Sequence, residues 1–230
     1  DYGTGSLGDM GCHLMDVPIK ALGLYDPYSV EASISRLPYV RSYTPADVSS
    51  SSVPASSIVT YRFNPSKLND SKVKFTWMDG GLRPSQPDQI KEDIGVGGIL
   101  IYGEKGIISC NDYGTRAKLY IDGEVVETGQ FDGIPSNSFN HYTSWVEAMV
   151  DGYGSDKHKN LNSGFDVAGP ISEVVLLGNV AVRSGLLKRS PRSNVFIGRK
   201  RLDYDSKNMV ITNFDQANQF LTREYRKGWE

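Results

Sequence analysis

At 230 residues the chain is long enough to form one large domain or two small ones, and it can bury a core without disulfides. With 39% hydrophobic residues, 23% charged residues and a formal net charge of −2, it has the composition of an ordinary globular protein. This charge balance gives no reason to expect nucleic acid or an anionic membrane as a partner. No apolar run approaches the ~20 residues that a membrane-spanning helix needs.

The chain starts without a methionine, and its first motif follows at once. We therefore expect an excised part of a longer protein, with any targeting segment upstream, so that a cytoplasmic and a periplasmic location both stay open. The two cysteines, Cys12 and Cys110, are each predicted to be buried thiols rather than partners in a disulfide.

The first predicted element is a helix from about Gly8 to Leu22, because apolar residues recur there at helical spacing. Gly23 provides a C-terminal stop. Pro18 lies inside this stretch and has no N–H to donate to the Leu14 carbonyl, so we expect a kink.

Short β-like runs follow the helix. In the run ending at Met78, Val73, Phe75 and Trp77 alternate with polar residues, which is typical of a strand with one face in water. The pair Asp122–Gly123 indicates a hairpin turn within the last run. The predicted strands are Tyr28–Ser35, Ile58–Phe63, Lys72–Met78, Gly98–Gly103, Gly106–Cys110 and Lys118–Glu127.

Helices are predicted for the remainder of the chain, over Asn140–Gly152, over Ala168–Gly185 and in the tail from Asp215. Four residues of the first of these helices form one apolar stripe: Tyr142, Trp145, Val146 and Met149. The order of one helix, about six strands and then helices predicts an α+β fold with mostly antiparallel pairing, in one domain over residues 1–230.

The opening stretch "GTGSLGDMGCHLMD" permits two interpretations. Gly3, Gly5 and Gly8 spell the G-x-G-x-x-G fingerprint of dinucleotide-binding proteins. That fingerprint needs a buried strand before it and a parallel βαβ unit around it, and only Asp1 and Tyr2 precede Gly3. The sequence therefore favours the second interpretation, a helix with polar residues on one face.

On that helix Asp9 and His13 lie one turn apart on the same face, within reach of one small substrate. A histidine can take a proton from an alcohol, and a carboxylate can orient either partner. Two alternatives stay open. In the first alternative, Asp9 caps the helix and His13 is a hydrogen-bonded core residue. In the second, Asp9, His13 and Asp16 hold a metal ion, although the sequence has no further histidine or cysteine cluster to support such a site.

Further candidates lie at the end of the third predicted strand. Trp77 is predicted to stack on a sugar, with Asp79 and Arg83 bonding its hydroxyls; the alternative is that Trp77 packs in the core and the other two shape the turn. His141 is a candidate substrate contact at the start of a helix, where a histidine bonded to backbone is the commoner case.

A basic run near the C-terminus raises the question of phosphate or nucleic-acid binding. It has few interleaved aromatics and the chain is slightly acidic, so we expect a solvated surface or a contact to another domain. The cations are Lys188, Arg189, Arg192, Arg199, Lys200 and Arg201.

Several ordered motifs resemble one family. "GTGSLGDMGCHLMDVPIKALGL", "SVPASSIVTYRF", "FTWMDGGLRPSQP", "GILIYGEKGIIS", "PISEVVLLGNVAVRSG" and "TNFDQANQFLTREYRKGWE" are similar, in this order, to the C-terminal domain of Gfo/Idh/MocA oxidoreductases, especially the group abundant in Bacteroidetes. Glu104 replaces the aspartate usual in the hairpin motif. The resemblance implies an open sheet of about six strands with helices packed on one face.

The resemblance also implies a function. The family pairs such a domain with an N-terminal Rossmann domain, expected to lie outside this chain, that holds NAD or NADP and an active-site lysine. Asp9 and His13 correspond to the family's acid–base pair, acting on a sugar or cyclitol, and the sheet face implies a homo-oligomer. No cofactor and no metal are expected in this chain alone. The alternatives are an NAD-dependent glycoside hydrolase on the same scaffold and a non-enzymatic dimerisation or carbohydrate-binding module.

Overall fold

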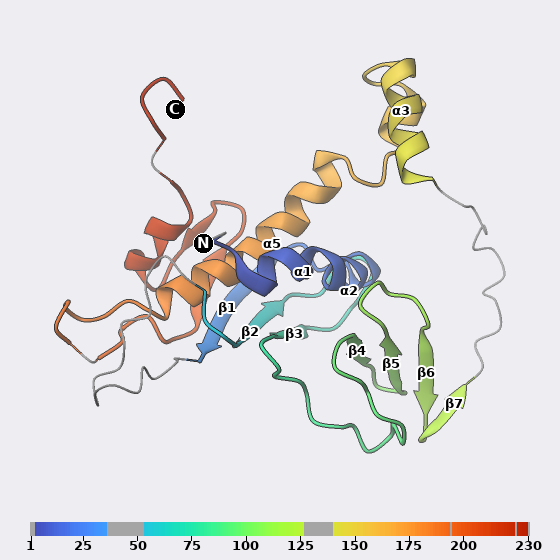
Figure 1. The fold of residues 1–230 in the computed structure, drawn as a ribbon, viewed down its shortest axis with the longest axis horizontal. Coiled ribbons are helices and arrows are strands. Elements are labelled where there is room, and N and C mark those ends of the chain that lie inside the picture. Colours follow the sequence, from blue (N-terminus) through green and yellow to red (C-terminus); the bar gives the residue numbers. More distant parts are fainter. Residues whose placement is uncertain (1–2, 36–52, 127–139, 194, 224, 230) are drawn as a thin grey trace.

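The computed structural model describes residues 3–35, 53–126, 140–193, 195–223 and 225–229. It is an α+β structure with two sheets, of five and four strands (Figure 1). Every strand pair in these ranges is antiparallel, so the predicted fold class and pairing are confirmed. The expectation of one sheet of about six strands is wrong, because the long connection of residues 79–98 separates two groups of strands.

The five-stranded sheet has the order β3–β2–β1–β8–β9. Its strands are β1 (Pro27–Ile34), β2 (Ser57–Phe63), β3 (Val73–Met78), β8 (Leu202–Asp205) and β9 (Val210–Ile211). The first three match predicted strands to within one residue at each end. The last two were not predicted, because they are too short to show a clear alternating pattern.

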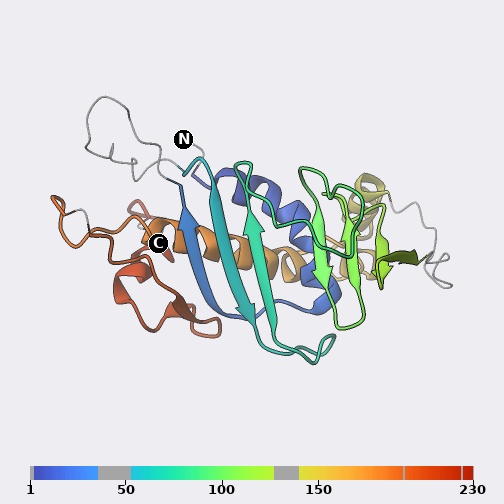
Figure 2. The same ribbon diagram turned by 90° about the horizontal axis from the view of Figure 1, so that it is seen from below.

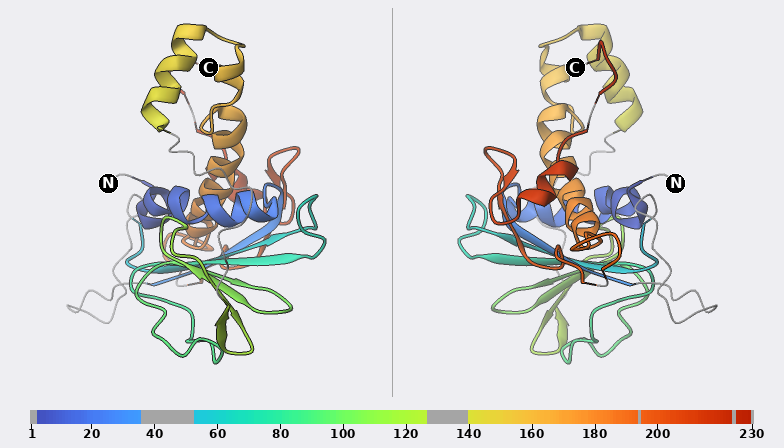
Figure 3. Two further views of the ribbon diagram at one scale, coloured as in Figure 1. Left: turned by 90° about the vertical axis from the view of Figure 1, so that its right-hand side faces the viewer. Right: turned by 90° about the vertical axis from the view of Figure 1, so that its left-hand side faces the viewer.

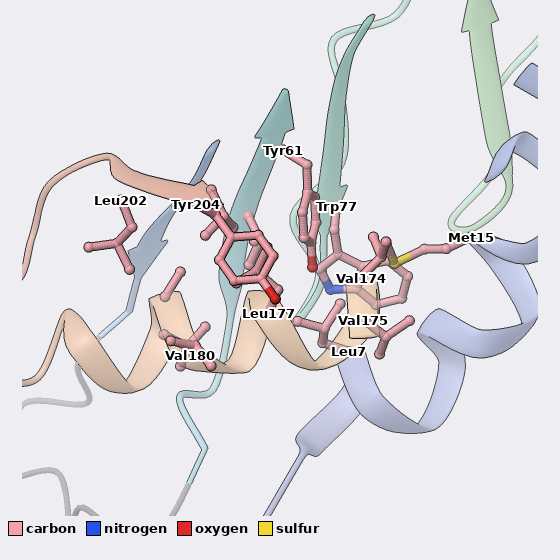
Figure 4. Close-up of a cluster of buried hydrophobic side chains, with 14 of the residues drawn as sticks. Leu7, Met15, Tyr61, Trp77, Val174, Val175, Leu177, Val180, Leu202 and Tyr204 are labelled. Atoms are coloured by element: carbon pink, nitrogen blue, oxygen red, sulfur yellow. The ribbon is translucent and has the colours of Figure 1, made fainter. Parts of the chain in front are cut away.

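One face of this sheet is buried under helices. Alternate residues of β2, Val59, Tyr61 and Phe63, are buried, while those between them are partly exposed. The buried face is covered by α1 (Gly5–Leu14), α2 (Asp16–Leu22) and α5 (Phe165–Ser184), which Figure 3 shows on one side of the sheet. Side chains from the strands and α5 interdigitate there to form the main core (Figure 4).

The four-stranded sheet lies beside β3 (Figure 2) and has the order β4–β5–β6–β7. The strands are β4 (Ile99–Tyr102), β5 (Ile107–Cys110), β6 (Lys118–Ile121) and β7 (Glu124–Val126). The expected turn at Asp122–Gly123 joins β6 to β7, and both residues have positive φ. A small separate core of Ile90, Ile107 and Tyr120 covers one side. Glu127 lies outside the described residues.

The predicted first helix is divided at Met15. The Pro18 ring conflicts with a helical carbonyl four residues earlier, at Leu14, and α1 ends at that residue. Pro18 is the third residue of α2, in the first turn, where its missing N–H removes no intrahelical bond. The predicted kink is therefore a break between two helices, and Gly23 ends the second in a left-handed conformation (φ 65°).

The helix α3 (His141–Asp151) turns its apolar stripe outward. Tyr142, Trp145, Val146 and Met149 are between 52% and 81% exposed, so the stripe does not pack on the core. The acidic side faces α4 (Asp156–Lys159), where Lys157 Nζ lies 3.5 Å from carboxylate oxygens of both Glu147 and Asp151. The stripe is therefore an exposed apolar surface, the kind that marks a contact with a partner.

The C-terminal region differs from the prediction. The described part of the tail forms a 3₁₀ turn, η1 (Asp215–Phe220), instead of a helix. Asn218 holds this turn against β9, because its Oδ1 accepts a hydrogen bond from the Ile211 N–H (2.7 Å) and its Nδ2 donates one to the Ile211 carbonyl (3.1 Å). The basic run forms a hairpin between Leu187 and Ile197, with exposed arginines as expected.

By length and composition, α5 is the one helix in the described ranges that would suffice to cross a membrane. A helix at the centre of a core passes the same test, and α5 packs on β1, β2 and α1. The finding is therefore weak support for a membrane span.

The buried hydroxyl of Tyr61 lies close to the Gly178 backbone, but within the described ranges it makes no hydrogen bond of normal geometry. Replacing Tyr61 by Phe is therefore expected to change the free energy of unfolding at pH 7 by less than about 1 kcal/mol. Burial raises the pKa of this hydroxyl far above its usual range. An unfolded tyrosine ionises near pH 10. Above about pH 10 the unfolded state therefore loses this proton while the folded state keeps it. The contribution of this group to the free energy of unfolding is thus fully present below about pH 10 and is lost as the pH rises further.

Urea titrations of both proteins at pH 7 and above pH 10 check this. The Phe variant should lose less stability than the parent at alkaline pH. A large loss for the variant at pH 7 would show that the hydroxyl has a partner after all.

Candidate functional site

The helix α1 has one buried side and one exposed side. Leu7 and Gly11 face α5, and a methyl group at Gly11 would touch Val175 Cγ1 at 3.4 Å. Asp9 and His13 lie on the opposite side, four residues apart, and both are exposed. Helical geometry puts such a pair roughly 6 Å apart. The expected arrangement of Asp9 and His13 on one open helix face is therefore present, and His13 is not a core residue.

Cys12 is exposed on the same side of α1, so the prediction that it is a buried thiol is wrong. The helix turns this position away from α5, which the apolar character of cysteine does not reveal. Cys110 is partly buried, and burial raises the pKa of its thiol. Both cysteines are free.

The glycines before Asp9 do not form a phosphate loop. Gly5 is the first residue of α1, and Gly8 lies within its first two turns. Gly8 is needed for packing, since a Cβ there would lie 2.2 Å from the Thr4 side chain. Two of the three glycines of the fingerprint are therefore helical residues.

Tyr113 lies beside His13 and was not predicted. The ring centroids are 5.8 Å apart with an interplanar angle of 63°, an edge-to-face arrangement, and Tyr113 is 68% exposed. Tyr113 belongs to the connection between β5 and β6, a hundred residues along the chain. No local sequence signal links it to α1, so only the tertiary structure could find it.

The connection that carries Tyr113 is held against the helices. Asn111 Oδ1 accepts hydrogen bonds from the backbone N–H groups of Tyr113 (3.2 Å) and Thr115 (2.9 Å). Gly114 has φ +69°, and a Cβ there would lie 2.5 Å from Val17 Cγ2 in α2. Only glycine allows this approach, which brings the backbone that carries Tyr113 close to the helices.

Trp77 and Asp79 are engaged within the protein. Trp77 is 6% exposed and packs in the main core (Figure 4). Its indole N–H donates to Asp79 Oδ2 at 2.9 Å, and the Ser57 hydroxyl lies 2.9 and 3.0 Å from the two carboxylate oxygens. No ring face of Trp77 is open to a sugar, and Asp79 joins the ends of β2 and β3. This geometry favours the structural interpretation of both residues.

Arg83 and His141 are not brought to Asp9 and His13. Arg83 Nη1 donates to the Gly95 carbonyl at 3.0 Å and lies 3.4 Å from Asp93 Oδ1, so it ties together the connection between the sheets. His141 is exposed at the first turn of α3, which Figure 1 places beyond the N-terminal end of α5.

A pocket of about 290 Å³ lies at the N-terminal end of α1, between the ends of β2 and β3 and helix α5. Thr4, Ser6, Asp79 and Asn179 are among its lining residues. Since α1 is roughly 15 Å long, this pocket and His13 lie at opposite ends of the helix. Asp79 there already accepts bonds from Ser57 and Trp77, whereas the buried Nδ2 of Asn179 has no hydrogen-bond partner among the described residues.

Asp16 does not complete a metal site with Asp9 and His13. Lys20 Nζ lies 3.2 Å from Asp16 Oδ1, an ion pair along α2. Within the described ranges, no three His, Cys, Asp or Glu side chains are grouped as metal ligands.

Comparison with models of known protein families finds no match for this chain, and comparison with curated proteins finds none either. The function must therefore be argued from the residues and their arrangement.

Proposed function

We propose that this chain is the substrate-binding and catalytic half of an NAD(P)-dependent sugar or cyclitol oxidoreductase, with Asp9 and His13 as the acid–base pair. One observation carries the proposal: the carboxylate and the imidazole share the exposed side of α1, one turn apart. Both groups are accessible to a small substrate, and neither is paired with another charged side chain among the described residues.

In this proposal His13 takes the proton from a substrate hydroxyl as it becomes a carbonyl, and returns it in the reverse direction. Asp9 accepts a hydrogen bond from the same or a neighbouring hydroxyl, which orients the substrate toward the imidazole. Polyols suit this pair because each hydroxyl is both a donor and an acceptor.

In this proposal the cofactor would be held by a separate dinucleotide-binding domain, since Gly5 and Gly8 are part of helix α1. When bound, NAD(P) would exchange a hydride with the substrate carbon. The residues described here would bind, orient and exchange a proton with the substrate.

We further propose that the fold is that of a Gfo/Idh/MocA C-terminal domain. The α+β class and the helices on one face of the larger sheet support this (Figure 3). No helix of the described residues covers the outer face of this sheet (Figure 2), and we propose this face for a homo-oligomer contact. The outward apolar stripe of α3 gives a further reason to expect a partner body over this chain.

Product analysis with the complete protein, NAD(P) and a panel of sugars and cyclitols tests the proposed reaction. Net reduction of the nicotinamide with a free sugar is the expected result. Glycoside cleavage without net change of the cofactor would favour the hydrolase, and saturable sugar binding without turnover would favour the binding module.

A further inference from the structure

We propose that Tyr113 is a positioning residue for His13, which it holds in the orientation needed for proton transfer. The inference rests on the proposed function of Asp9 and His13. It starts from the edge-to-face contact of the two rings, 5.8 Å between centroids at 63°.

An exposed imidazole on a helix would otherwise sample several rotamers. His13 is exposed, and no hydrogen bond joins its ring to another residue of the described ranges, so no polar partner there fixes its orientation. The Tyr113 ring is the aromatic group that touches it. This contact therefore biases the imidazole toward one orientation.

Tyr113 is suited to this role because the backbone that carries it is held in place. Asn111 holds the backbone on both sides of it, with bonds to the N–H groups of Tyr113 and Thr115. Gly114 packs against Val17, which anchors the same connection to α2. A side chain on an ordered loop can restrict its neighbour at little cost in entropy.

Two variants separate the ring from the hydroxyl. Replacing Tyr113 by Leu removes the aromatic contact, whereas replacing it by Phe keeps the ring. In the complete protein we expect the Leu variant to lower kcat about three- to tenfold with KM little changed, and the Phe variant to retain kcat within twofold. A tenfold effect equals about 1.4 kcal/mol, the size of an aromatic pair.

The spectroscopic readout uses the 230-residue chain itself. Ring-current shifts of the His13 imidazole protons, assigned by comparison with a His13→Gln variant, should persist in the Phe variant and disappear in the Leu variant. Thermal unfolding of each variant shows that the fold is retained.

The outcomes distinguish this inference from the proposed function. If His13→Ala abolishes turnover while Tyr113→Leu leaves kcat unchanged, the positioning role is wrong and the proposed function stands. A rise in KM alone, or equal losses for the Phe and Leu variants, would also overturn the role of the ring. Unchanged turnover in His13→Ala would overturn both.

Discussion

Replacing His13 by Ala in the complete protein is expected to lower kcat/KM by about 10²–10⁴-fold, the usual contribution of a general acid–base group. The imidazole is exposed on α1, so its loss should leave the fold intact. Because the site is open, added imidazole should restore part of the rate. Steady-state kinetics with and without imidazole measure both effects.

A matched control is His158→Gln. His158 is a partly buried histidine in α4, with its ring 4.7 Å from Tyr153, and it lies outside the proposed site. Its replacement should leave kcat/KM within about twofold. The isosteric change Asp9→Asn should reduce the rate less than His13→Ala, because it keeps a hydrogen-bond acceptor. A loss below tenfold for His13→Ala would argue against the acid–base role.

Replacing Gly178 by Ala is expected to destabilise the protein by about 1–2 kcal/mol. A Cβ at this position of α5 would lie 2.0 Å from the Tyr61 hydroxyl and 2.6 Å from Leu7 Cδ2. Tyr61 is fully buried and Leu7 is 3% exposed, so neither can move into free space. The overpacking penalty, roughly 1–3 kcal/mol or more, exceeds the gain of about 1 kcal/mol from replacing a helical glycine.

Gly11 in α1 provides the matched control, because it is also a buried helical glycine at the contact between α1 and α5. A Cβ there would meet its neighbours at 3.4–3.5 Å, an ordinary contact distance. Gly11→Ala should therefore leave the stability unchanged or raise it by up to about 1 kcal/mol. Urea denaturation of both variants measures the difference. Equal stability of the two would show that the core between Tyr61 and Gly178 is looser than described.

The larger part of the secondary structure follows from local patterns. Alternating burial in β2, the Asp122–Gly123 turn, and the end of α2 at Gly23 all depend on residues a few positions apart. The same holds for the shared face of Asp9 and His13, because four residues make about one helical turn. Such features could be predicted because their causes are short-range.

Other features depend on residues distant in the sequence. The sequence determined that α3 has an apolar stripe, but only the tertiary structure shows that this stripe faces outward. The tail became a 3₁₀ turn because Asn218 bonds Ile211. Trp77 was a candidate for stacking on a sugar, but the structure buries it in the main core, where it is 6% exposed.

The candidate site shows the same division. Its carboxylate and imidazole are adjacent by helical periodicity, which the chain specifies by itself. Its aromatic neighbour, Tyr113, arrives from the connection between β5 and β6, and only the packing of Gly114 on Val17 brings it there. The spacing of residues along the chain sets which groups share a helix face. Contacts between distant segments form only when the packing of the whole fold stabilises them.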